Sequence, residues 1–229
     1  LLVHYGRPED VFSKLLEDYD VRALYYNHDY EPSARERDER IGRLFSQKGL
    51  EVRSFKDQVI FEKDEIVKAD GEPYTVFTPY MRRWKECFSE KGSGEVPSPR
   101  AAKNFFKSRG FSMPSPGDLG FTESDQEFPS ATPREEIIRN YHLNRDFPAR
   151  QGTSRMGIHL RFGTVSVRDL VKKASKENEI YLNELIWREF YMMILWHFPR
   201  VVDSAFKPGY DRINWRNDEH EIRAWMEGK

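Results

Sequence analysis

The chain has 229 residues, with 38% hydrophobic, 14% aromatic and 33% charged side chains and a formal net charge of -1. This composition excludes a disordered protein, and the length allows one large domain or two modest ones. The near-zero charge excludes a global basic field of the kind that accompanies many nucleic-acid-binding proteins. The single cysteine, Cys87, excludes an internal disulfide and fits a reducing compartment.

No apolar run reaches the roughly 18 residues that a membrane span needs, and no secretory signal opens the chain. We therefore expect a cytoplasmic protein without membrane contact. The chain begins inside an apolar run without an initiator Met, and it stops where more structure is expected to follow a helix. We expect it to be part of a longer protein.

Strand and helix patterns alternate over the first 60 residues or so. The order strand, helix, strand, helix, strand is predicted at residues 1–5, 9–19, 21–26, 33–50 and 51–55. Ser33 is the expected N-cap of the second helix. A strand-helix-strand order implies a parallel sheet with a right-handed crossover, so we predict the later part of an open α/β sheet. Such sheets bind ligands at the carboxyl ends of their strands, where the polar loop 27–32 lies.

The rest of the chain is predicted to be helical. Thr78 followed by Pro79 indicates the N-cap and first residue of a further helix. Residues 90–133 are rich in Gly, Ser and Pro, as in an interdomain linker. We therefore predict an α/β domain at residues 1–89, a linker at 90–133 and an all-α domain at 134–229. Helices of the last domain are predicted at residues 134–141, 156–162, 166–176, 183–197 and 218–227.

The helix predicted at residues 183–197 is free of Gly and Pro and is apolar almost all round, as a buried helix would be. One face carries side chains at i, i+3, i+4 and i+7, namely Glu184, Trp187, Arg188 and Tyr191. Polar groups on a buried helix cost free energy unless a polar partner meets them. The pattern alone allows a core helix with a satisfied ion pair or a ligand-binding face, and packing is the commoner explanation.

A second candidate site follows the linker. Between Arg134 and Lys173, seven Arg and two Lys stand against four acidic residues, and Arg suits phosphate recognition. Residues 152–154 offer two hydroxyls and backbone amides before a short helix, which can cradle a phosphate. A chance cluster of charge and a simple capping turn are the alternatives. No metal site is predicted.

Four segments resemble motifs of the photolyase/cryptochrome family in letters, order and spacing. They are Thr153-Ser154-Arg155-Met156-Gly157, His159-Leu160-Arg161-Phe162-Gly163, Asn183-Glu184-Leu185-Ile186-Trp187-Arg188-Glu189-Phe190-Tyr191 and His197-Phe198-Pro199. Residues 76–80 are similar to the end of the family's antenna domain, and residues 224–229 to the segment that leads into the rest of its flavin domain. The chain is most similar to a class I cyclobutane pyrimidine dimer photolyase. The resemblance implies a fragment that lacks the first strands and the later half of the flavin domain.

The resemblance implies that the helical domain binds FAD. The matching positions are Tyr141, Thr153, Ser154, Arg155, Met156, Gly157, Tyr181 and Arg188. Gly157 departs from the pattern, because many members have Ser there and gain a side-chain hydrogen bond. A second, antenna chromophore is also implied. Folate-binding relatives carry Asn-Glu where this chain has Ser33 and Ala34, which argues against folate and leaves a deazaflavin, another flavin or an empty pocket.

The activity implied is that of a deoxyribodipyrimidine photo-lyase acting on double-stranded DNA with pyrimidine dimers, without an obligate protein partner. Glu184 and Trp187 match the catalytic residues that meet a flipped-out dimer, Trp187 by stacking and Glu184 by hydrogen bonding. Excited reduced FAD would donate an electron, the cyclobutane ring would split and the electron would return. DNA-contacting positions implied by the resemblance are Arg145, Glu184, Leu185, Ile186, Trp187, Arg188, Glu189, Phe190 and Tyr191.

Further expectations concern electron transfer, core packing and the alternative functions. Trp215 matches the surface end of the family's electron-transfer chain. Leu185, Ile186 and Phe190 are also expected to pack in the core whatever the helix does. A cryptochrome-like photoreceptor without repair activity is the alternative function. A third hypothesis is that the chain is an inactive fragment. Glu184 with Trp187 favours repair of cyclobutane dimers, since relatives that repair (6-4) lesions usually carry Gln in place of Glu184.

Overall fold

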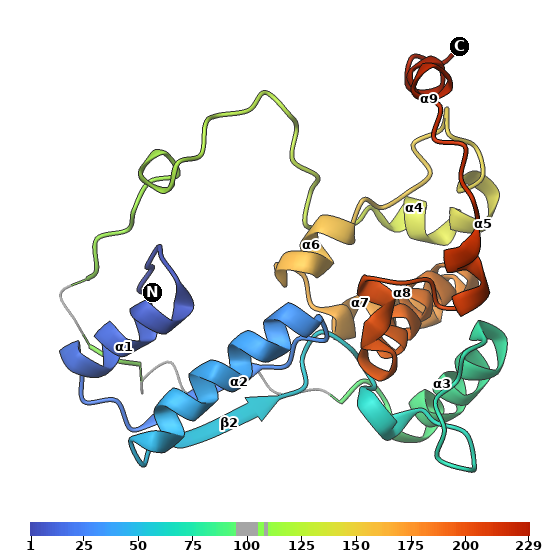
Figure 1. The fold of residues 1–229 in the computed structure, drawn as a ribbon. Coiled ribbons are helices and arrows are strands. Elements are labelled where there is room, and N and C mark those ends of the chain that lie inside the picture. Colours follow the sequence, from blue (N-terminus) through green and yellow to red (C-terminus); the bar gives the residue numbers. More distant parts are fainter. Residues whose placement is uncertain (95–104, 108–109) are drawn as a thin grey trace.

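A computed structural model of the chain describes residues 1–94, 105–107 and 110–229. Its elements confirm the predicted fold class, an α/β part followed by a helical part (Figure 1). In chain order they are α1 Pro8–Asp18, β1 Ala23–Asn27, α2 Pro32–Gln47, β2 Glu51–Phe55, α3 Phe77–Lys91, α4 Glu135–Arg139, α5 Tyr141–Asn144, α6 Gly157–Phe162, α7 Val167–Glu177, α8 Glu179–His197 and α9 Glu219–Met226. Part of the predicted linker, residues 95–104 and 108–109, lies outside the described residues.

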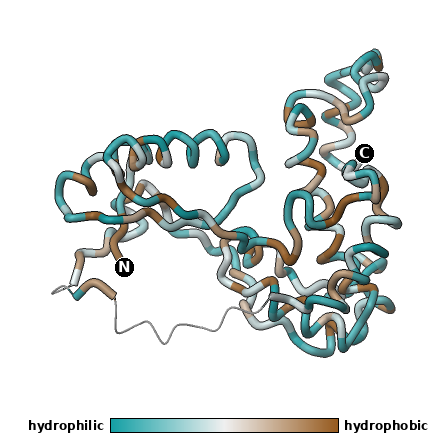
Figure 2. The backbone as a smooth tube through the Cα atoms, turned by 90° about the horizontal axis from the view of Figure 1, so that it is seen from below, coloured by the Kyte–Doolittle hydropathy of each residue, from teal (hydrophilic) through white to brown (hydrophobic). Residues whose placement is uncertain are grey.

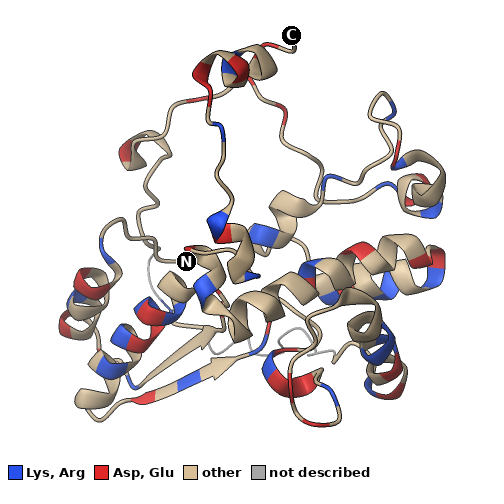
Figure 3. Cartoon of the chain, turned by 45° about the vertical axis from the view of Figure 1, so that its right-hand side comes forward, with Lys and Arg blue, Asp and Glu red and all other residues tan. Residues whose placement is uncertain are grey.

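The chain forms two lobes, which Figure 2 shows side by side. In the smaller lobe β1 and β2 pair in parallel, from Ala23 opposite Glu51 to Asn27 opposite Phe55, and α2 makes the crossover between them. Its small core consists of Leu24, Ile41 and Phe45. Figure 3 shows Lys and Arg interspersed with Asp and Glu along α2, as on a solvated helix face.

The predicted strand at residues 1–5 is wrong. These residues form no strand, and Leu1 is 94% exposed. An apolar run becomes a strand only where a neighbouring strand accepts its hydrogen bonds, and β1 pairs with β2 alone among the described residues.

Two predicted N-caps are also wrong. Ser33 lies inside the first turn of α2, which starts at Pro32 with Glu31 as N-cap. Thr78 likewise lies inside α3, whose N-cap is Val76. In α2 the proline occupies the first helical position, where its missing N–H costs nothing, and this preference outweighs the serine.

The larger lobe holds the main core, and α3 belongs to it. Tyr80, Trp84 and Cys87 of α3 are each 1% exposed and pack with residues of α7 and α8. Cys87 is therefore packed as an ordinary core residue. Helix α3 belongs to the first predicted domain, whereas α7 and α8 belong to the second. The core is therefore continuous over the predicted boundary at residue 89, and the division into domains stays a prediction. Among the described helices, none has both the length and the apolar content to cross a membrane.

A buried carboxylate joins three segments of the larger lobe. Glu189 of α8 is 2% exposed. Its Oε2 accepts a hydrogen bond from the Ile60 N–H at 2.7 Å, and its Oε1 accepts from the Phe61 N–H at 3.0 Å. The indole N–H of Trp84 donates to the same Oε1 at 2.5 Å. The segment after β2, α3 and α8 thus share one acceptor group.

Two guanidinium groups hold the neighbouring backbone. Arg188 donates to the Gln58 carbonyl at 2.7 Å and to the Leu160 carbonyl at 3.3 Å. Arg168 of α7 donates to the carbonyl and the carboxylate of Asp57, each at 3.0 Å. Residues 56–61, which lead from the small lobe into the large one, are therefore tied down by side chains of α7 and α8.

We expect the free energy of unfolding to fall as the pH rises from about 4.5 to about 7 because of Glu189. Burial raises the pKa of this carboxyl from 4.5 to about 7, against the lowering effect of its hydrogen bonds. In that window the folded state binds the proton more tightly than the unfolded state, so each rise in pH removes stability until the folded pKa is passed. A shift of this size corresponds to roughly 3 kcal/mol.

Urea unfolding of the full-length protein between about pH 4 and pH 8 measures this effect. Glu189→Gln removes the titrating group, so the wild type should lose roughly 3 kcal/mol relative to this variant across the window. Glu179→Gln is the matched control, because Glu179 is an exposed carboxylate in the first turn of the same helix. Parallel pH profiles for the wild type and Glu189→Gln would contradict the assignment.

Candidate functional site

Helix α8 positions most of the predicted site residues. It begins four residues before the predicted start, at Glu179, because the Asn178 side chain caps it by accepting from the Tyr181 N–H at 3.0 Å. The predicted polar face is divided in the structure. Glu184 and Trp187 line a cavity, whereas the guanidinium of Arg188 turns to backbone carbonyls of the neighbouring segments.

The cavity beside α8 has a volume of about 390 Å³. Its lining comes from α3, α5, the residues after α5, and α8: Phe77, His142, Arg145, Asp146, Ile180, Asn183, Glu184 and Trp187. The Glu184 carboxylate accepts a hydrogen bond from the Arg145 guanidinium. This contact raises the pKa of Arg145, so the group stays charged. The cavity therefore combines a carboxylate, a fixed cation and an aromatic wall.

The aromatic wall is a group of stacked rings. The Phe77 ring lies parallel to the Trp187 indole, with centroids 3.5 Å apart and planes 7° apart. Tyr191 stacks at 5.4 Å and 22° from the same indole, and Phe190 meets it edge-on at 5.6 Å. Tyr191 is 61% exposed, so this end of the wall is open to solvent.

Four of the predicted DNA-contacting residues are buried, and for their side chains the prediction is corrected. Helices α3, α5 and α7 pack on α8. The side chains that they enclose are Leu185, Ile186, Glu189 and Phe190, each 7% exposed or less. A side chain in the core cannot reach a nucleic acid, so these residues hold the helix in place, as expected for Leu185, Ile186 and Phe190.

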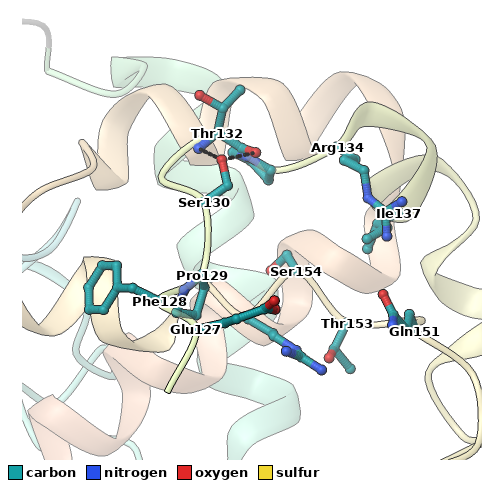
Figure 4. Close-up of a pocket in the computed structure, with 12 residues that line it drawn as sticks. Glu127, Phe128, Pro129, Ser130, Thr132, Arg134, Ile137, Gln151, Thr153 and Ser154 are labelled. Atoms are coloured by element: carbon teal, nitrogen blue, oxygen red, sulfur yellow. Dashed lines mark hydrogen bonds between the residues drawn. The ribbon is translucent and has the colours of Figure 1, made fainter. Parts of the chain in front are cut away.

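The predicted phosphate cradle lies between α5 and α6. Thr153, Ser154 and Arg155 line a cavity of about 210 Å³ together with residues 127–130 and 132–134. Figure 4 shows Ser130, Thr132 and Arg134 on the opposite side of this cavity from Thr153 and Ser154. Hydroxyl groups and guanidinium groups are the donors that a diphosphate needs, so these side chains fit the phosphates of a dinucleotide, and the Glu127 carboxylate lines the same cavity.

The backbone of the cradle is held in a tight bend. A Cβ at Gly152 would lie 2.7 Å from the Asn144 carbonyl oxygen, so only glycine permits this close approach. Arg155 has a φ of 54°, in the left-handed region that side chains rarely adopt. A Cβ at Gly157 would meet nothing within 4 Å. Met156 is 3% exposed and packs in the core.

Residues 127–130 are docked on α6 by a buried histidine. His159 is 2% exposed, and its Nε2 lies 2.8 Å from the Pro129 carbonyl oxygen, to which it donates. Its Nδ1 lies 2.8 Å from the Thr164 hydroxyl, within hydrogen-bond distance. Phe128 packs edge-on against the imidazole at 5.2 Å. The end of the predicted linker is thereby fixed as one side of the cradle.

Three predicted cofactor residues meet at the start of α8. The Ser154 and Tyr181 hydroxyls are 2.8 Å apart, and Tyr141 packs edge-on against Tyr181 with centroids 5.1 Å apart. Burial raises the pKa of both phenols, so they stay protonated and can donate hydrogen bonds. Trp215, in contrast, is 68% exposed and lies in the loop before α9, far along the sequence from these residues.

A third cavity, of about 180 Å³, lies at the carboxyl ends of β1 and β2, where the loop 27–32 was expected to meet a ligand. His28 bridges Glu62 and Ser54, each at 2.8 Å from one ring nitrogen. The Arg35 guanidinium lies 3.9 Å from the centroid of the Trp196 ring, over which Lys63 also lies at 5.1 Å. The described residues contain no group of three or more His, Cys, Asp or Glu that could hold a metal ion.

Several residues that line the α8 cavity were not predicted from the sequence. Phe77, His142 and Ile180 line the α8 cavity, but no motif pointed to them. The spacing of Phe77, Tyr80 and Trp84 predicts that they share one face of α3. That signal could have found Phe77 as a packing residue, but not its partner on a distant helix.

Comparisons with known proteins agree with this arrangement. Residues 1–101 match the family described as DNA photolyase, and residues 181–229 match the FAD binding domain of DNA photolyase. A deoxyribodipyrimidine photo-lyase from Halobacterium salinarum is 29% identical over 100% of this chain and 52% of its own length. The chain spans about half the length of the curated relatives it matches.

Two solved structures have the same fold. An archaeal photolyase from Sulfolobus tokodaii, solved with two FAD molecules, superposes with a TM-score of 0.71 at 27% identity over 99% of this chain and 50% of its own. A class III photolyase from Agrobacterium tumefaciens superposes with a TM-score of 0.75 at 23% identity over 97% of this chain and 51% of its own. With both family matches, these likenesses show that the chain belongs to the photolyase/cryptochrome family, with FAD as its cofactor.

Proposed function

We propose that the full-length protein is a deoxyribodipyrimidine photo-lyase that splits cyclobutane pyrimidine dimers in double-stranded DNA under light. The observation that carries this proposal is the cavity on α8, where the Glu184 carboxylate and the Trp187 indole share one wall. A carboxylate can accept a hydrogen bond from the imide N–H of a pyrimidine, and an indole offers it a stacking face. The names of the relatives support the same activity.

The residues of the cavity have separate roles in this proposal. Trp187 stacks on one base of the flipped-out dimer, and Glu184 accepts a hydrogen bond from the edge of a base. In the free protein Arg145 forms an ion pair with Glu184. When a base replaces Arg145 as the hydrogen-bond partner of Glu184, the partly exposed Arg145 can bind a DNA phosphate instead. Tyr191, which is exposed about two turns further along α8 than Glu184, contacts the DNA beside the flipped-out dimer.

FAD is held by the cradle in this proposal. Thr153, Ser154 and the backbone of residues 155–157 bind its phosphates, with Tyr141 and Tyr181 close by. When bound, the cofactor supplies one-electron chemistry on excitation by light. Arg188 stays a predicted cofactor contact, and its two hydrogen bonds to carbonyls leave its role toward FAD to be tested. Trp215 stays the predicted entry point for electrons from outside.

The cavity at the strand ends is our candidate for an antenna chromophore. It combines the Trp196 ring with the cations Arg35 and Lys63 and the acidic side chains of Asp29, Asp38 and Glu39, which suits an aromatic ligand that both donates and accepts hydrogen bonds. Ser33 and Ala34 lie in the first turn of the neighbouring helix α2, and the absence of folate stays a prediction from the sequence. The archaeal photolyase solved with two FAD molecules supports a flavin in this role.

A blue-light photoreceptor without repair activity is the alternative, and the same cofactor residues would serve it. The two functions separate in an assay of the full-length, photoreduced protein with a dimer-containing oligonucleotide under blue light. We expect light-dependent loss of dimers. An intact flavin spectrum without any loss of dimers would contradict the repair proposal and favour the photoreceptor.

Glu184→Gln should slow dimer splitting roughly tenfold to a hundredfold, because the variant lacks one charge-assisted hydrogen bond to the lesion. The flavin absorption spectrum should stay unchanged. Glu179→Gln is the control, because Glu179 lies one to two turns away on the same helix and pairs with Lys85 at 2.6 Å outside the cavity. Loss of the flavin from Glu184→Gln would show a structural role instead.

Gly157→Ser should tighten FAD binding roughly threefold to tenfold, by adding one hydrogen bond at the cradle. There is room for the new side chain, because a Cβ at this position meets nothing within 4 Å. Gly157→Ala, which has the same backbone effect without a hydroxyl, is the control. Equilibrium dialysis of the full-length apoprotein against FAD measures both, and equal affinities of the two variants would remove Gly157 from the phosphate site.

A further inference from the structure

The Trp187 indole is covered on one side by a residue from another helix. Phe77 lies parallel to it at 3.5 Å and 7°, and both rings line the same cavity as Glu184. At this separation the covered face has no room for a third ring. Tyr191 also stacks on the indole, at 5.4 Å and 22°. A base that stacks on Trp187 must therefore use the part of the indole that neither ring covers.

Phe77 is itself held in place by the core. Its ring meets Phe190 edge-on, with centroids 5.8 Å apart and planes 73° apart. Two turns further along the same face of α3, Trp84 donates its indole N–H to the buried Glu189. The first turn of α3 is therefore fixed relative to α8, and the Phe77 ring is a firm support for the indole.

We propose that Phe77 is a positioning residue of the lesion cavity. It backs the Trp187 indole and fixes the plane in which the indole meets a flipped-out pyrimidine. Without the ring, Trp187 can leave this orientation in the free protein, and ordering it on binding then costs conformational entropy. The inference rests on the proposed function, and it extends the cavity to a residue of the segment predicted as the antenna domain.

The test compares dimer-containing and undamaged duplexes in binding to the full-length, FAD-loaded protein. Phe77→Ala should weaken binding of the dimer duplex roughly threefold to tenfold and leave the undamaged duplex unchanged. Phe77→Tyr, which keeps the ring, should retain the wild-type preference. The flavin spectrum should be the same in all variants.

Phe88→Ala is the matched control. Phe88 also lies on α3 and stacks on a tryptophan, Trp84, at 5.0 Å and 18°, but it does not line the cavity. A general loosening of α3 would change dimer binding equally in Phe77→Ala and Phe88→Ala. Equal effects of the two variants would overturn the proposal.

A double-mutant cycle with Trp187→Ala shows whether Phe77 acts through the indole. In that background, Phe77→Ala should have no further effect on dimer binding. A full additional loss there would mean that Phe77 acts independently of Trp187, and the proposal would fail. If the wild type itself shows no preference for the dimer duplex, the proposed function fails and this inference fails with it. A preference that Phe77→Ala leaves intact overturns this inference alone.

Discussion

The two oxygens of Glu189 hold the site together. Taking a carboxylate out of water costs several kcal/mol, of the order described for buried ions, and the cost is tolerated only where hydrogen bonds replace the lost water. Here three N–H groups replace it, two from the backbone after β2 and one from α3. Because each of those groups would be buried without another acceptor, the carboxylate and its donors depend on one another.

This arrangement decides which side of α8 faces solvent. Glu189 and Arg188 point into the junction between the lobes, where they bind the segment 56–61. The side that carries Glu184 and Trp187 is left to line a cavity with Arg145. A rotation of the helix would break the buried hydrogen bonds, so the orientation of the cavity residues is set by groups that no substrate touches.

The helices could be predicted from the sequence because their apolar periodicity is a local property. The starts of α7, α8 and α9 follow from capping by the side chains of Ser166, Asn178 and Asp218. The strand predicted at residues 1–5 was wrong for a non-local reason, because a strand needs a neighbouring strand as its hydrogen-bonding partner. Glu189 shows the same limit within the site. Its family motif suggested DNA contact, and only the position of α3 and the segment after β2 identifies it as a buried anchor. Phe77 could not be paired with Trp187 by any pattern within one helix.

The burial of Cys87 has a practical consequence for labelling chemistry. Thiol reagents react only with thiols that are accessible to solvent, and the Cys87 side chain of α3 is buried in the core, at 1% exposure. It is also the one cysteine in this chain of 229 residues. A cysteine introduced at an exposed position of α8 beside the cavity would therefore be the single reactive thiol of the chain. A dye attached to it would report on the cavity without disturbing the core.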